Sequence, residues 1–224
     1  LAVECAYCLC EIINRGMEDE KKVVLLTELR IFDTLCRLSQ IDASNTGSST
    51  TSNNGGSSVK KLDLINDSNG GTQIEAVAAT AELINIAGLA LIQGWELDDP
   101  TSCQSTIIQM KQCLELTLAC LAYDSIDVSG AVVDGTSRIL VSLEKKEDNW
   151  VTIFGDTSIC NTILSRILII LQRRMKYPHN FQYDYENEEE AEEEVYRTSL
   201  RKLYQRIVRL RPQITLQFIG QLLN

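Results

Sequence analysis

Residues 74–96, IEAVAATAELINIAGLALIQGWE, decide the fold class of this chain. Apolar and small residues recur there in alternating steps of three and four: Ile74, Val77, Ala81, Ile84, Gly88, Leu91 and Trp95. A helix turns once in about 3.6 residues, so this spacing puts all of them on one helical face. The segment therefore predicts a long helix with one buried side.

The same helical period recurs along most of the chain. The first predicted helix ends near Gly16, and others cover about 19–39, 101–122, 125–146, 156–176 and 187–210, with an eighth beginning at Pro212. The predicted buried faces of the first two helices are Leu1, Cys5, Cys8, Ile12 and Leu25, Leu29, Phe32, Cys36. Asp156 is the expected N-cap of the sixth helix.

These helices predict an all-α fold. Each pair of helices has two broad apolar faces, and stacking of pairs buries both. We therefore expect an α-solenoid of antiparallel helix pairs, as in HEAT-like repeats, with a compact helical bundle as the competing architecture.

The expected domains follow from this pairing. HEAT-like helix pairs are predicted at 1–43, 73–123 and 124–177, and 178–224 holds an acidic loop and a charged helix that opens a further pair. Between the first two pairs, residues 44–72 begin with the low-complexity run SNTGSSTTSNNGGSS. Its composition cannot bury apolar surface, so we expect a disordered insertion.

The composition limits the classes of partner. The 224 residues carry a net charge of −10, with a pI near 4.7. A net-negative surface repels phosphate, which argues against non-specific nucleic-acid binding but leaves room for a local basic stripe or a basic protein partner. Because the chain begins with Leu1, we expect an internal piece of a longer protein; no secretory or membrane-spanning segment is expected.

Eight cysteines and one histidine are the residues that suggest site chemistry. Cys5-x-x-Cys8, with Cys10 and Cys36, invites a zinc interpretation, yet no second ligand pair follows, so we expect these thiols to pack in the core. The same core placement is expected for Cys103, Cys113, Cys120 and Cys160, and a surface loop for His179. No catalytic set, phosphate loop or dinucleotide fingerprint is present, so neither an enzyme, a cofactor nor a small-molecule substrate is expected.

The segment from Tyr183 to Leu203, YDYENEEEAEEEVYRTSLRKL, joins an acidic run directly to a basic helical pattern. Part of this order suits a helix dipole, with acids at the N-terminus and bases toward the C-terminus. So dense an acidic block is also typical of an interaction segment. The residues expected either to form a solvated face or to contact a partner are Glu188, Glu189, Glu190, Arg197, Arg201, Lys202, Arg206 and Arg209.

Two stretches of the sequence resemble one family of transport receptors. The first is Y-x-Y-E-N-E-x-E-x-E followed by Y-R-x-x-L-x-x-L, carried by Tyr183, Tyr185, Glu186, Asn187, Glu188, Glu190, Glu192, Tyr196, Arg197, Leu200 and Leu203. The second is CLCEIINRGMEDEKKVVLL, from Cys8 to Leu26. In this order they resemble a central fragment of the tRNA exportins (the exportin-T family) of the importin-β/karyopherin superfamily. The Ser/Asn-rich tract at 44–58 departs from that family's pattern and looks like an insertion.

The resemblance implies a HEAT solenoid that carries tRNA from nucleus to cytoplasm with the GTP form of Ran. It implies nucleoporins as further partners, shuttling between nucleus and cytoplasm, and contact with Ran or tRNA for the charged residues of 188–209. Related importin-β-type receptors share an acidic block before a Tyr-Arg helix. An importin-β-like receptor for protein cargo and a general HEAT-repeat scaffold are therefore the alternatives.

Overall fold

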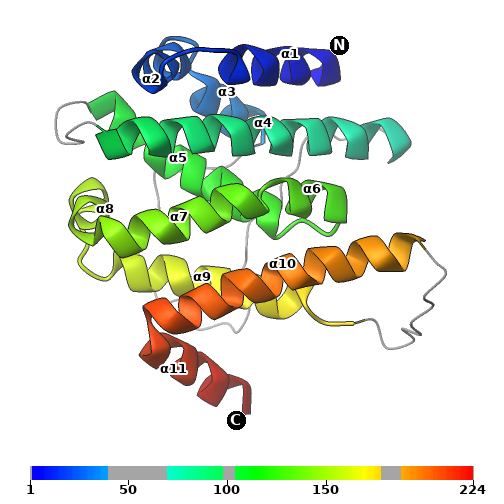
Figure 1. Ribbon diagram of the computed structural model, residues 1–224, viewed down its shortest axis with the longest axis vertical. Helices are drawn as coiled ribbons and strands as arrows, with labels where there is room; N and C mark the ends of the chain where they lie inside the picture. Colours follow the sequence, from blue (N-terminus) through cyan, green and yellow to red (C-terminus); the bar gives the residue numbers. More distant parts are fainter. Residues whose placement is uncertain (1, 40–69, 98–103, 178–187, 224) are drawn as a thin grey trace. The chain divides into compact units, whose positions relative to one another are not determined.

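The computed structural model describes residues 2–39, 70–97, 104–177 and 188–223 (Figure 1). These residues form helices without any strand, which confirms the all-α class. The helices are α1 (Ala2–Asn14), α2 (Asp19–Glu28), α3 (Ile31–Leu38), α4 (Gly70–Leu97), α5 (Gln104–Leu121), α6 (Ile126–Ala131), α7 (Val133–Lys145), α8 (Glu147–Phe154), α9 (Ile159–Arg174), α10 (Glu188–Leu210) and α11 (Pro212–Leu223).

The chain divides into two compact units, Leu1–Thr157 and Ser158–Asn224. In the first unit α4 is the central helix: α1 and α2 lie along one side of it and α6 and α7 along the other, and it also packs on α5 (Figure 1). The face predicted from its three-and-four spacing is confirmed from Val77 to Trp95, whereas Ile74 is exposed. The sequence 74–96 therefore identified the helix around which this unit packs.

Two glycines let neighbouring helices approach α4 closely. A Cβ atom at Gly88 would lie 2.9 Å from the Sγ of Cys113 on α5, and one at Gly94 would overlap the Val23 side chain on α2. A larger residue at either position would require the Cys113 or Val23 side chain, or the helix that carries it, to move.

The window Ile74–Trp95 is long and apolar enough to cross a membrane, which corrects the expectation that no segment reaches that length. Half of this window is buried inside the protein. Its contacts with five other helices make it the core helix of this unit.

The predicted buried face of α1 is wrong. Cys5, Cys8 and Ile12 are exposed, while Ala6, Cys10 and Ile13 are buried. Apolar residues surround this helix on all sides, so periodicity alone offered two competing stripes. Leu1 lies outside the described residues.

The single helix predicted at 19–39 is interrupted. Arg30 has a left-handed backbone conformation, with φ of 49°, and separates α2 from α3. The break shifts the helical register, so Leu26 rather than Leu25 or Leu29 is fully buried on α2, whereas Phe32 and Cys36 on α3 are buried as predicted.

The segment predicted as one weak helix at 125–146 forms α6 and α7, which meet at Val132. The side-chain Oδ1 of Asn85 on α4 accepts a hydrogen bond from the Gly135 backbone N–H at 2.7 Å. This bond satisfies one of the free amides at the start of α7.

Helix α8 was absent from the sequence-based expectation. Its Trp150 is fully buried, donates to the Oγ of Ser142 at 3.0 Å, and meets the Trp95 ring edge-on at 5.6 Å. Aromatic contacts of this kind add to the free energy of area burial.

The second unit consists of α9, α10 and α11, each in contact with the other two. The apolar stripes at helical spacing are buried on α9 (Ile159, Ile163, Ile167, Ile170) and on α10 (Tyr196, Leu200, Leu203, Ile207), whereas Leu210 at the end of the α10 stripe is half-buried. The N-cap of α9 is Ser158 rather than Asp156, because the helix begins three residues later than Asp156.

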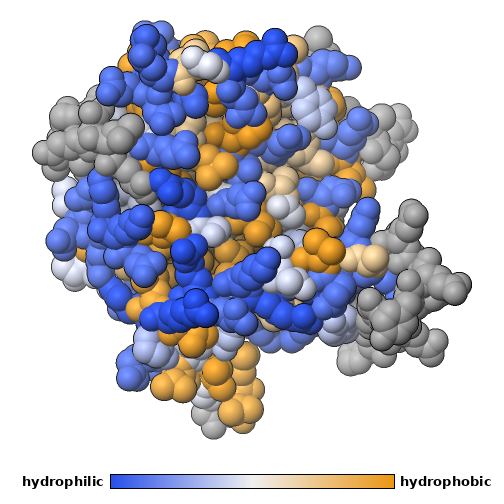
Figure 2. Space-filling model, viewed as in Figure 1, coloured by the Kyte–Doolittle hydropathy of each residue, from blue (hydrophilic) through white to orange (hydrophobic). Residues whose placement is uncertain are grey.

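Helix α11 begins at Pro212 as predicted and leaves an apolar surface exposed (Figure 2). Its exposed large apolar side chains are Leu216, Ile219, Leu222 and Leu223. Stacking of helix pairs would cover a face of this kind. Stacking into a solenoid and the helix-pair domain boundaries remain predictions. Most of the insertion predicted at 44–72, Cys103 and His179 lie outside the described residues.

Candidate partner-binding surface on helix α10

Charge alternates along the sequence of the second unit. Residues 158–183 contain four Arg or Lys and no acid, and 184–194 contain eight acids and no base. Residues 195–224 contain five Arg, one Lys (Lys202) and no acid. The acidic block is thus flanked by basic segments on both sides.

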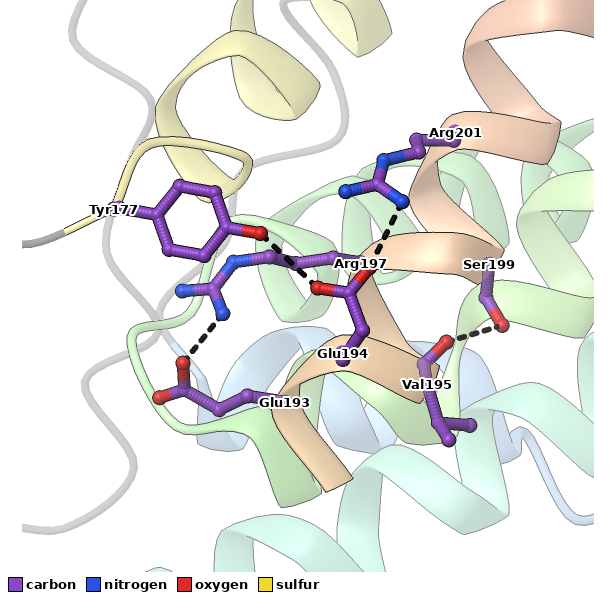
Figure 3. Close-up of polar contacts among 7 residues, drawn as sticks. All are labelled: Tyr177, Glu193, Glu194, Val195, Arg197, Ser199 and Arg201. Carbon is purple, nitrogen blue, oxygen red and sulfur yellow. Dashed lines mark hydrogen bonds and ion pairs between the residues drawn. The ribbon is translucent and has the colours of Figure 1, made fainter. Parts of the chain in front are cut away.

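Within the acidic block, Glu194 makes polar contacts through both of its carboxylate oxygens (Figure 3). Its Oε2 accepts a hydrogen bond from the Tyr177 hydroxyl at 3.0 Å, and its Oε1 accepts one from Nη1 of Arg201 at 2.9 Å. The Tyr177 hydrogen bond is the main cause that holds the pKa of Glu194 below its ordinary value, and the Arg201 and Arg197 cations add to it. Glu194 is therefore ionised at neutral pH and occupied on both oxygens.

Arg197 lies inside the unit rather than on its surface. Only 6% of the residue is exposed. Its Nη1 lies 2.6 Å from Oε2 of Glu193, one turn earlier on α10, and its guanidinium carbon lies 4.0 Å from the centre of the Tyr177 ring (Figure 3). An ion pair on one side and an aromatic face on the other hold this side chain in place.

The same end of α9 contacts α10 at a second point. Nε of Arg174 donates to the Tyr196 hydroxyl at 3.2 Å, and its guanidinium carbon lies 5.6 Å from that ring's centre. The end of α9 therefore lies against the first turns of α10, and the two helices run in opposite directions (Figure 1).

The remaining predicted residues differ in exposure. Lys202 and Arg209 are exposed and make no ion pair with the part of the chain that the structure describes, Arg206 is half-buried, and the Arg201 side chain is 47% exposed. We call Arg201, Lys202, Arg206 and Arg209 the basic ridge. Glu190 is half-buried, while the side chains of Glu188 and Glu189 lie outside those described.

Sequence reasoning missed Tyr177 and Arg174. Both belong to the run Arg173–Tyr177, RRMKY, at the end of α9. Like charges in so dense an acidic block repel one another, and nearby cations offset that repulsion. This run supplies three cations just before the loop. The charge alternation described above was the available signal.

The cysteines offer no metal site among the residues described. No group of three or more potential ligands occurs there. Cys10, Cys36, Cys113, Cys120 and Cys160 are buried, as expected, whereas Cys5 and Cys8 are exposed. Burial raises the pKa of Cys36, Cys113 and Cys120 to about 12 and that of Cys10 to about 11, so these four thiols stay protonated at neutral pH.

Comparison with known proteins places this geometry in context. The chain is distantly similar to an exportin. Human exportin-T is 20% identical to it over 228 aligned residues, which cover 100% of this chain and 20% of exportin-T. The chain therefore spans about a fifth of the length of that relative. No family model matches the chain.

Proposed function

We propose that this chain is a central segment of a nuclear export receptor that carries tRNA from nucleus to cytoplasm in complex with GTP-bound Ran. The observation that carries this proposal is the similarity to exportin-T along the whole chain. The two motifs that resemble the tRNA exportins, at Cys8–Leu26 and Tyr183–Leu203, support it because they occur in the family's order.

The basic ridge supports an RNA partner. The chain as a whole is acidic, with a net charge of −10, so attraction for phosphate has to be local. On α10 the exposed side chains of Lys202 and Arg209 supply such a local charge. Arginine and lysine contacts to phosphate position a nucleic acid without reading its sequence.

The receptor works by coupled binding rather than by catalysis. Ran–GTP and tRNA each favour the receptor conformation that the other binds, so each raises the affinity for the other by the same factor. The receptor needs no cofactor, passes the nuclear pore through contacts with nucleoporins, and releases its cargo when Ran hydrolyses GTP.

The direct test is binding of fluorescently labelled tRNA to the full-length protein that contains this chain. Ran locked in its GTP form is added in one series and Ran–GDP in a control series. Tighter tRNA binding with Ran–GTP alone supports the proposal. Equal binding in both series, or none, contradicts it.

The same experiment separates the alternatives. An importin-β-like receptor for protein cargo, favoured by the acidic block that precedes Tyr196 and Arg197, binds Ran–GTP but not tRNA. A general HEAT-repeat scaffold binds neither.

The ridge is tested by reversing Lys202 and Arg209 to Glu, which leaves the described ion pairs of α10 intact. We expect tRNA affinity to fall while helix content is unchanged. Lys145→Glu, an exposed charge reversal on α7, is the matched control and has no effect on tRNA binding. If the double variant binds tRNA with unchanged affinity, the basic ridge is a solvated face rather than an RNA contact.

A further inference from the structure

The ion pair between Arg201 and Glu194 joins two residues of one helix that are farther apart than the usual three or four positions. The two residues are seven positions apart, about two turns or roughly 10 Å along the axis. One turn from Arg201 lie Arg197 and Thr198 on one side and Tyr204 and Gln205 on the other, so no carboxylate is available nearby on α10. Arg201 reaches back to the acidic block instead.

A residue outside α10 fixes the orientation of the Glu194 carboxylate. The Tyr177 hydroxyl, just beyond the end of α9, binds one carboxylate oxygen and leaves the other directed at Arg201 (Figure 3). Glu193, its neighbour, is bound to the buried Arg197. Glu194 is therefore the acid of this cluster that meets the basic ridge.

Another anion can replace the Glu194 carboxylate in its contact with Arg201. The side chains of Arg201 and Glu194 are 47% and 34% exposed, so solvent screens the pair and its net contribution is small. A guanidinium group binds carboxylate and phosphate with the same fork of N–H donors. A phosphate held against the ridge by Lys202 and Arg209 can take the place of the carboxylate.

We infer that Glu194 is an intramolecular competitor that occupies Arg201 in the free protein and is displaced by an RNA phosphate. This inference rests on the proposed function, since it names the regulation of the same ridge. An RNA phosphate that contacts only Arg201 must compete with Glu194 and binds weakly. An RNA that also contacts the other residues of the basic ridge binds tightly enough to displace Glu194 from Arg201.

The test measures the affinity of labelled tRNA for the full-length protein with Ran–GTP at fixed salt. Four proteins form a double-mutant cycle: the native protein, Glu194→Gln, Arg201→Gln and the double variant. Glu192→Gln is the matched control, because it removes the same charge from an exposed position two residues earlier on α10. Circular dichroism checks that each variant keeps its helix content.

Glu194→Gln is expected to tighten tRNA binding roughly two- to fivefold, the range that an exposed ion pair supports. Glu192→Gln changes it less. Arg201→Gln weakens binding, and in that background Glu194→Gln has no further effect because its target is gone.

Three results overturn the inference while leaving the proposed function in place. The first is Ran-dependent tRNA binding that Glu194→Gln does not tighten. The second is equal tightening by Glu192→Gln, and the third is equal tightening by Glu194→Gln with Arg201 already removed; both assign the effect to general charge. Absence of Ran-dependent tRNA binding in the native protein overturns the proposed function itself.

Discussion

Replacing Arg197 by Met tests whether this arginine stabilises the fold or is instead a surface residue that contacts a binding partner. Methionine is an unbranched, flexible side chain of similar helix propensity that lacks the charge of arginine. The matched control is Arg201→Met, the same change one turn later at a half-exposed site. The two variants differ chiefly in burial and in contact with Tyr177.

The magnitude follows from two contacts. The guanidinium lies 4.0 Å from the centre of the Tyr177 ring, a cation–π contact that contributes about 1 kcal/mol when partly desolvated. The pair with Glu193 joins side chains that are 8% and 33% exposed. Its loss falls between the surface and buried limits, at about 1 kcal/mol after discounting for solvent at Glu193. We therefore expect Arg197→Met to cost about 2 kcal/mol and Arg201→Met less than about 1 kcal/mol.

Urea unfolding followed by far-ultraviolet circular dichroism measures both values. Amide hydrogen exchange then assigns the loss to α9 and α10, because Arg197 and its partners Glu193 and Tyr177 all lie in the second unit. If Arg197→Met is no more destabilising than Arg201→Met, the buried role given to Arg197 is refuted.

Three further changes test local features of the fold. Gly94→Ala forces a methyl group into Val23 and should cost about 1–3 kcal/mol in urea unfolding. Gly220→Ala on α11 meets open space and should instead stabilise by about 0.5–1 kcal/mol in the same assay; equal effects would contradict the close α2–α4 approach. Tyr177→Phe removes the main cause of the low pKa of Glu194, so an NMR titration should show that pKa rising toward 4.5. Native stability drawn from this lowered pKa is present above about pH 4.5 and lost on acidification, and Tyr177→Phe should lose less; an unchanged pKa refutes the hydrogen bond.

The predicted stripes of the long helices were recovered from the sequence, since the three-and-four spacing of α4, α9 and α10 marks buried positions. On α4 that prediction was incomplete, because Ala79 and Leu83 on the opposite face are buried too, where helices pack on both of its sides. Helix α1 shows where this reasoning fails. Its apolar residues occupy both faces, and contact with α4 rather than periodicity selects Ala6, Cys10 and Ile13 for the core.

Local breaks were not predictable for a different reason. The end of α2 depends on Arg30, which adopts a left-handed conformation that is rare for arginine. Neither glycine nor proline, the usual sequence signals of a helix end, is present there. Helix α8 has only eight residues, too few for a periodic signal, and its Trp150 is placed by Trp95, which lies far away in the sequence.

The candidate surface was predictable in outline but not in detail. The sequence identified the bases of α10, yet it could not separate the buried Arg197 from the exposed Lys202. That difference depends on Tyr177, which lies just beyond the end of α9 and covers Arg197. Tertiary contact, rather than residue type, decides which bases are free to meet a partner.

The most direct test of the central proposal is a complete linkage cycle on the full-length protein. It measures tRNA affinity with and without Ran–GTP, and Ran–GTP affinity with and without tRNA. The proposal predicts that each partner raises the affinity for the other by the same factor, on the order of tenfold or more. Independent binding of the two partners would contradict it.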